Sequence, residues 1–326
     1  MKISVIIPTF NGGRFLEEAL NGLLVQTSPI YEAILVDDGS TDNTRKIIDN
    51  FKSKLPIKAF YKEKSGNWVA TTNVGLTHAS GDYISILHQD DLWLPNRVAV
   101  LTEILRTHPE SNVIVHPSWF IGPNGKTVGN WNLPFGNKQR PIASVEILNK
   151  LIIQNFISMP APLISRRALE TIGGLDETLW YTADWKLWLS LARLEKWIYH
   201  PLPLTCFRIH PNSQTISGGQ SVQSYADQLH NVQDPLLDGF FGKKTRTLAR
   251  FNTEVNLALI HILFSQPYQW FSLVLKFIAL GPYGWHQFFS ISRIHERLTA
   301  RLRLGKNLIR TRHSVIESSD PFSRDR

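Results

Sequence analysis

The first ninety residues alternate between two kinds of pattern. Short runs of β-branched and aliphatic side chains occupy residues 3–8, 33–36, 57–61 and 83–87. The segments between them carry apolar side chains at helical spacing over residues 14–26, 41–51 and 67–79. Continuous apolar runs are typical of strands that are buried on both faces. This alternation predicts an α/β fold with a mostly parallel central sheet flanked by helices.

The pattern changes after Pro95. Helical spacing recurs over residues 96–107, 144–153, 166–172 and 185–194. Extended segments are predicted over 113–121 and over 127–131, which pair as a hairpin. A further extended segment is predicted over 198–209, and Pro201 and Pro203 interrupt it. From about residue 220 onward the pattern is almost wholly helical. We therefore predict an α/β domain over 1–217 with halves 1–95 and 96–217, a helical region over 218–313, and a disordered tail over 314–326.

Composition constrains the class of protein. The chain has 326 residues, which suits one large domain plus an accessory region. Its single cysteine, Cys206, excludes an internal disulfide framework and favours a reducing compartment. The apolar run at the N-terminus is too short for a signal peptide. The longest apolar stretch, 268–291, is interrupted by Lys276 and Gly281-Pro282, so we expect a cytoplasmic protein without a spanning helix.

The C-terminal third combines positive charge with aromatic residues. The formal net charge of the chain is +8, and residues 293–313 hold seven Arg and Lys against one acid, Glu296. Aromatic side chains gather just before this stretch, at Trp270, Phe271, Phe277, Trp285, Phe288 and Phe289. Residues 268–313 therefore predict a peripheral contact with an anionic membrane on its cytoplasmic side and no nucleic-acid partner. A solvated helix face, a helical cap on the catalytic domain and a homodimer interface are the alternatives.

Acidic residues follow two of the predicted strands. Asp37-Asp38 ends one strand, and His88-Gln89-Asp90-Asp91 ends another. Ligands of open parallel sheets bind at the edge where strands finish, and close carboxylates repel one another there. A divalent cation such as Mg²⁺ or Mn²⁺, bound to substrate phosphates, would relieve that repulsion. Ser40 or Thr41 is expected to cap the next helix, and a capping role for Asp38 itself would leave the second cluster unexplained.

These motifs resemble the family 2 glycosyltransferases. The resemblance rests on ISVIIPTFN at 3–11, VDDGSTD at 36–42 and ASGDYISILHQDD at 79–91, and it extends over about 1–217. It implies the GT-A fold, a nucleoside-diphosphate sugar donor and inversion at the transferred sugar. The acceptor implied is a glycan or a lipid-linked molecule, as in the assembly of cell-surface polysaccharides or glycolipids.

The resemblance also implies roles on the nucleotide side. Pro8 and Phe10 flank the base, and Asp38 binds it. Asn11, Asn73 and Gln89 are further nucleotide-site candidates, and Asp90 holds the metal with Asp91 as its outer neighbour. The sequence departs from the family pattern at His88, which replaces the first acid of D-x-D and either binds manganese or contacts the ribose. Thr72 replaces an arginine that contacts phosphate, so Lys64 or Arg208 is expected to supply that charge.

On the acceptor side, GGLDE at 173–177 and ADWKLW at 183–188 continue the resemblance. Asp184 is the implied general base, with Ala183 where relatives carry Glu; the alternative is a helix N-cap. Arg208 and His210 alternate onto one face of an extended segment. They are expected to meet the diphosphate, with His210 either completing the metal shell or serving a structural role.

The sequence therefore predicts a metal-dependent glycosyltransferase. The alternative is a catalytically impaired sugar-nucleotide binder that assists assembly at a membrane, which the departures at Thr72 and His88 keep open. A dinucleotide-dependent dehydrogenase is excluded because no G-x-G-x-x-G follows the first strand.

Overall fold

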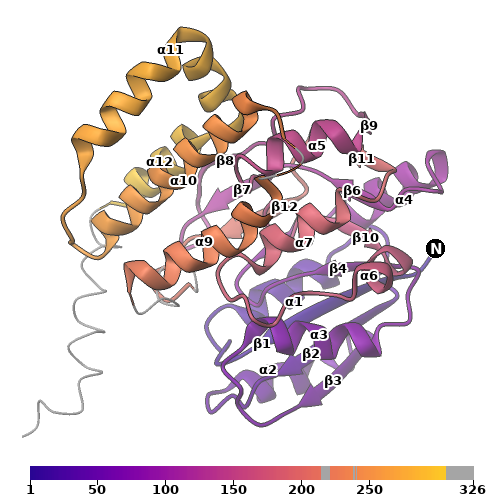
Figure 1. Ribbon diagram of the computed structural model, residues 1–326. Helices are drawn as coiled ribbons and strands as arrows, with labels where there is room; N and C mark the ends of the chain where they lie inside the picture. The colour runs from indigo at the N-terminus through magenta and orange to yellow at the C-terminus, as the bar shows by residue number, and fades with distance from the viewer. Residues whose placement is uncertain (214–220, 238, 240, 306–326) are drawn as a thin grey trace, which may run out of the picture.

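The computed structural model describes residues 1–213, 221–237, 239 and 241–305. The predicted tail 314–326 and the basic residues 306–313 lie outside these ranges. The core is an eight-stranded sheet of order β3-β2-β1-β4-β10-β6-β11-β9 (Figure 1). The strands are β1 (Ile3–Thr9), β2 (Glu32–Asp37), β3 (Ile57–Tyr61), β4 (Tyr83–Ile86), β6 (Val113–Val115), β9 (Arg140–Ile142), β10 (Leu163–Ser165) and β11 (Trp197–Tyr199).

One half of this sheet is wholly parallel, and the other half is mixed, with β6 and β11 parallel to each other. Strands β1 to β4 run parallel, as the strand–helix alternation predicts. Strand β10 is antiparallel to both β4 and β6, and β9 is antiparallel to β11. Neither β9 nor β10 was predicted, because three residues are too few to show a period.

A smaller sheet of order β5-β12-β7-β8 lies beside the first. It contains β5 (Leu92–Trp93), β7 (Ser118–Ile121), β8 (Thr127–Trp131) and β12 (Thr205–Arg208). The predicted hairpin is present, since β7 and β8 pair antiparallel. The predicted single strand over 113–121 is instead two strands in different sheets, β6 and β7, with Pro117 between them.

Helices cover both faces of the main sheet. Every side chain of β1 is therefore buried. Val5 and Ile7 share a core with α1 (Leu16–Leu24), α2 (Thr44–Phe51) and α4 (Arg97–Thr107). Ile6 belongs to the opposite core, with α3 (Trp68–His78), α5 (Ser144–Leu151), α6 (Arg166–Ile172) and α7 (Ala183–Leu191). The expectation that Ser40 or Thr41 caps α2 was wrong: Asn43 precedes the helix, and Asp42 Oδ1 accepts from Thr44 N at 3.0 Å.

The C-terminal helices form a layer against the core that contains Ile6 (Figure 1). They are α9 (Val222–Leu237), α10 (Lys243–Leu263), α11 (Trp270–Ser292) and α12 (Ile294–Arg303). Helix α11 bends at Gly281, which has a φ of 63° and is followed by Pro282. Helix α12 then returns to the small sheet and packs on β8. None of the helices in the described ranges has the length and hydrophobicity that a bilayer crossing requires.

Candidate active site

A cleft of about 440 Å³ opens at the carboxyl ends of β1, β2 and β4. One group of lining residues, called the donor side after the roles predicted from the sequence for Asp38 and Asp90, comes from the ends of these strands and the start of α3. It contains Pro8, Phe10, Asp38, Trp68, His88, Gln89 and Asp90. A second group of lining residues, called the acceptor side after the role predicted from the sequence for Asp184, comes from β8, the loop between α5 and β10, the loop before α7 and its first turn, and α12. It contains Trp131, Asn155, Trp180, Tyr181, Asp184, Arg297 and Arg301. Segments far apart in the sequence therefore line one cavity.

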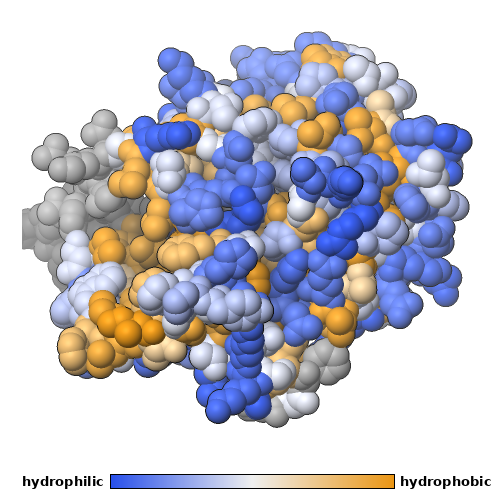
Figure 2. All heavy atoms as spheres, turned by 90° about the horizontal axis from the view of Figure 1, so that it is seen from above, coloured by the Kyte–Doolittle hydropathy of each residue, from blue (hydrophilic) through white to orange (hydrophobic). Residues whose placement is uncertain are grey.

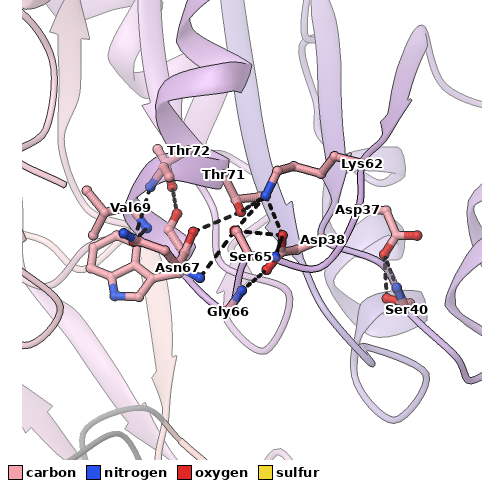
Figure 3. A network of polar contacts seen from close by, with 12 residues as sticks. Asp37, Asp38, Ser40, Lys62, Ser65, Gly66, Asn67, Val69, Thr71 and Thr72 are labelled. Carbon is pink, nitrogen blue, oxygen red and sulfur yellow. Dashed lines mark hydrogen bonds and ion pairs between the residues drawn. The ribbon is translucent and has the colours of Figure 1, made fainter.

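Asp38 is buried on the donor side and tied to the loop before α3 (Figure 3). Its Oδ1 accepts hydrogen bonds of 2.8 Å from both the amide and the hydroxyl of Ser65, and pairs with Lys62. Its Oδ2 accepts from the Gly66 amide at 2.8 Å, the only such bond to this oxygen from the described residues. Burial opposes ionisation, but these donors hold the pKa of Asp38 below its ordinary value. Oδ2 can therefore accept a further hydrogen bond, such as one from an N–H group of a nucleotide base.

Gln89 fixes the segment that follows β1. Its side-chain amide makes two hydrogen bonds of 3.0 Å with the main chain of Phe10, donating to the carbonyl and accepting from the N–H. The Lys64 ammonium lies 4.7 Å from the centre of the Phe10 ring. Gln89 therefore positions the backbone beside Phe10, while its own polar atoms are engaged.

Asn11 and Asn73, two predicted nucleotide-site residues, do not line the cleft. The side-chain oxygen Oδ1 of Asn11 accepts a hydrogen bond of 2.9 Å from the Thr41 main-chain amide, which joins the loops after β1 and β2. The Asn73 amide bridges to the loop before α7, accepting from Leu175 N at 3.0 Å and donating to Leu175 O at 2.9 Å. Both side chains hold loops together.

A cluster of candidate metal ligands lies at the end of β4. Ligand atoms of His88, Asp90 and Asp91 all lie within 4.8 Å of one another. His210, from the segment after β12, places Nε2 at 2.7 Å from Asp90 Oδ2. Burial opposes the ionisation of Asp90, but the hydrogen bond from His210 lowers the pKa of this carboxyl below its ordinary value. Asp90 is therefore the ionised centre of the cluster.

Two buried atoms of this cluster have no hydrogen-bond partner among the described residues: His88 Nε2 and Asp91 Oδ2. Burial lowers the pKa of His88, so its ring is neutral and has a free lone pair. Burial, and then the charge of Asp90, raises the pKa of Asp91 well above its ordinary value. A divalent cation would give both atoms a partner and relieve the repulsion between the carboxylates. The residues present therefore fit a divalent cation that accepts mixed nitrogen and oxygen ligands.

Arg208 is committed to the interior of the protein. Its side chain is 0% exposed, and its guanidinium donates to Asp90 O at 2.7 Å, Gly122 O at 3.1 Å and Glu18 Oε2 at 2.6 Å. Its amide donates to Asp91 Oδ1 at 2.9 Å. Arg208 thus braces the backbone and the outer acid of the metal cluster, with three hydrogen bonds from its guanidinium to protein groups, and it also lines the cleft.

Asp184 lies on the acceptor side, in the first turn of α7. The N-cap position belongs to Thr182, so the capping alternative for Asp184 does not hold. Asn155 Nδ2 donates to Asp184 Oδ2 at 2.9 Å, and the Trp185 amide donates to Oδ1 at 2.7 Å. Burial outweighs these donors and raises the pKa of Asp184 to about 6. A carboxylate of this kind can accept a proton near neutral pH.

Of the seven residues named on the acceptor side, the sequence predicts Asp184 alone; the residues it misses include Asn155, Tyr181, Arg297 and Arg301. Asn155 and Tyr181 stand in loops without a motif. The two arginines were assigned to a surface stretch, because their helical spacing does not reveal which face of the helix meets the catalytic domain.

Comparisons with known proteins agree with this geometry. Residues 4–173 match the family model described as glycosyl transferase family 2. An uncharacterized glycosyltransferase of Rickettsia typhi is 29% identical over 255 residues, covering 75% of this chain and 73% of that protein. Another, from Nostoc, is 33% identical over 187 residues, covering 55% of this chain and 56% of the relative.

The fold also has solved counterparts. The crystal structure of S. aureus TarS 1–349 in complex with UDP-GlcNAc superposes with a TM-score of 0.67 at 19% identity, covering 98% of this chain and 92% of that one. The likeness at this identity is one of fold. Because the family model spans more than half of the chain, and the mixed sheet, the acid clusters after β2 and β4 and the acidic start of α7 agree with it, this chain belongs to glycosyl transferase family 2, with the GT-A fold and glycosyltransferase activity.

Proposed function

We propose that the chain transfers a sugar from a nucleoside-diphosphate sugar to an acceptor hydroxyl, with inversion at the sugar. One observation carries the proposal: a cluster suited to a divalent cation and a carboxylate able to accept a proton line the same cleft. An inverting transfer needs these two functions on opposite faces of the sugar. The complex of TarS with UDP-GlcNAc favours a uridine nucleotide on the donor side.

The side chains divide the work of a single displacement. The acceptor oxygen bonds to the anomeric carbon as the bond from that carbon to the diphosphate oxygen breaks, and the hydroxyl proton passes to Asp184. Asn155 holds the Asp184 carboxylate by its hydrogen bond to Oδ2. Asp38 and the Phe10 segment receive the base, and Gln89 keeps that segment in place.

His88 and Asp90 are the residues that would hold Mn²⁺ or Mg²⁺, with Asp91 beside them and His210 bonded to Asp90. When bound, the cation would neutralise charge on the departing diphosphate. The test is Asp90→Ala. We expect it to abolish both turnover and Mn²⁺-dependent binding of UDP while the melting temperature stays close to wild type. Near-normal turnover would remove Asp90 from the metal site.

A catalytically impaired sugar-nucleotide binder is the second candidate, and the substitutions at His88 and Thr72 favour it. The two candidates differ in one measurement. An enzyme releases nucleoside diphosphate from its donor in the presence of Mn²⁺, whereas an impaired binder retains the intact nucleotide sugar.

We further propose that α11 rests on an anionic membrane at the cytoplasmic surface and brings the cleft to a lipid-linked or surface glycan acceptor. One face of this helix is strongly exposed, with Trp270 47%, Phe271 77%, Val274 50%, Leu275 50% and Ile278 60% accessible. Hydrophobic side chains gather at the lower left of Figure 2, on the side of the molecule where Figure 1 places α11. Some of the other aromatics pack inward, since Phe288 is buried and Phe277 stacks on Trp285 at 5.2 Å, whereas Phe289 is 41% exposed.

Liposome co-sedimentation tests this proposal. We expect the chain to pellet with vesicles that contain anionic lipid, and Phe271→Glu with Ile278→Glu to stay in the supernatant. The control is Val145→Glu, since Val145 is similarly exposed at 59% on α5. No pelleting, together with dimerisation that the double variant abolishes, would assign the face to a second copy of the chain.

A further inference from the structure

Helix α12 presents two arginines to the cleft. Arg297 and Arg301 stand one helical turn apart, and both line the cavity. A neighbouring face of the helix is fixed to β8, where a Cβ placed on Gly129 would lie 3.3 Å from Ala300 Cβ. Glu296 adds to the anchor by accepting from Asn132 N at 3.0 Å. A helix that is fixed to β8 therefore presents both side chains to the cavity, with Arg297 partly buried and Arg301 exposed to solvent.

No acid pairs with either arginine in the described part of the chain. Arg297 has a single weak bond, from Nη2 to Ser292 O at 3.3 Å, and Arg301 has no hydrogen bond or ion pair there. Other arginines of the region are paired: Arg293 Nε donates to Glu296 at 2.8 Å. Burial, and then the charge of Arg301, lowers the pKa of Arg297 to about 10. Two neighbouring cations in a partly enclosed site repel one another, and a bound anion would relieve this.

The surroundings place this pair with the acceptor side. Burial raises the pKa of the Tyr181 hydroxyl, and the nearby charges of Arg301 and Arg297 oppose this rise. The metal cluster is instead braced from β12 and the segment after it, through Arg208 and His210. Trp131 and Phe207, whose rings meet at 5.0 Å, line the same cleft and offer apolar faces of the kind on which sugars pack.

We infer that Arg297 and Arg301 form an anion subsite for the acceptor, which carries a phosphate or carboxylate close to the hydroxyl that receives the sugar. The assignment of this subsite to the acceptor rests on the proposed glycosyl transfer. The anion site itself is inferred from the arginine pair alone. The planar guanidinium fork binds both kinds of oxyanion through paired hydrogen bonds. Such a subsite would select charged glycans over neutral ones.

The test is a binding titration on the full chain in the presence of UDP and Mn²⁺. The probes are glucose 6-phosphate, glucuronate and glucose, which separate phosphate from carboxylate and both from a neutral sugar. We expect at least one charged probe to bind saturably and glucose to bind at least 10-fold more weakly. In Arg297→Gln/Arg301→Gln, affinity for the charged probe should fall by at least 10-fold, while the dissociation constant of UDP changes by less than 2-fold.

Arg303→Gln is the matched control, because Arg303 is an exposed arginine of the same helix that is absent from the cleft wall and donates to Val128 O. It should bind the probes as wild type does. Equal binding of the charged probe by the double variant, or binding of no charged probe by wild type, would overturn the subsite. A 10-fold loss of UDP affinity in the double variant would overturn its acceptor assignment in favour of the donor diphosphate. UDP release from UDP-GlcNAc, measured without acceptor, reports on the proposed function separately.

Discussion

Asn155 sets the proton affinity of Asp184, and its removal should move the pH dependence of turnover. With a pKa of about 6, Asp184 is the proton-accepting carboxylate above pH 6 and is protonated below it. Turnover should therefore fall about 10-fold between pH 7 and pH 5. An aspartate with the ordinary pKa of 3.8 would lose less than about 10% over the same range.

Asn155→Ala removes the 2.9 Å hydrogen bond that stabilises the ionised form of Asp184. A hydrogen bond to a charged group contributes about 1.5 kcal/mol or more, and one pKa unit corresponds to about 1.4 kcal/mol, so the pKa should rise by about one unit. The ionised fraction at pH 7 then falls from about 90% to about 50%, and at pH 8 it recovers to about 90%. The variant should thus lose about half its turnover at pH 7 and regain it at pH 8.

The assay is kcat at saturating donor between pH 5 and pH 8.5, with thermal melting to confirm the fold. Asn149→Ala, on α5 and outside the cleft, controls for the loss of an asparagine side chain. An acid limb that stays at the wild-type position, or a loss of turnover that is equal at every pH, would refute the role given to Asn155.

Two further predictions follow from the same contacts. Asp184→Asn keeps the shape of the side chain but cannot accept the proton, so turnover should drop by about 100-fold or more while the donor affinity stays near wild type; an equal loss of donor binding would move Asp184 to the donor site. Arg208→Met should lower the free energy of unfolding in urea by about 3 kcal/mol, because it leaves three protein acceptors without their donor. A change below about 1 kcal/mol would show that the bracing is weak.

The sequence predicts the first half of the fold well, because each strand there is long enough to show its pattern. Strands β1 to β4 and helices α1 and α3 lie where the periodicity places them. The other half of the sheet depends on strands of three residues, such as β10. The position of β10 between β4 and β6 is set by tertiary contacts. Local pattern cannot reveal which distant strands it will join.

The candidate site shows the same division. Motifs locate side chains that follow a strand end, such as Asp38 and Asp90, because the topology brings these ends together. They do not show which partner each side chain will find: Asn73 bonds the loop at Leu175, and Arg208 bonds Glu18, 190 residues away. Arg297 enters the cleft only because α12 folds back onto β8, which no local sequence pattern encodes.

Nucleotide release from a panel of nucleotide sugars, with and without Mn²⁺, tests the central claim most directly. The chain is incubated with each donor, and free nucleoside diphosphate is measured over hours, with Asp184→Asn and Asp90→Ala in parallel. We predict Mn²⁺-dependent release from at least one donor, UDP-GlcNAc being the first to examine, with release at least about 10-fold slower in both variants. Donor binding without release by the wild-type chain would contradict the account and identify a sugar-nucleotide binder instead.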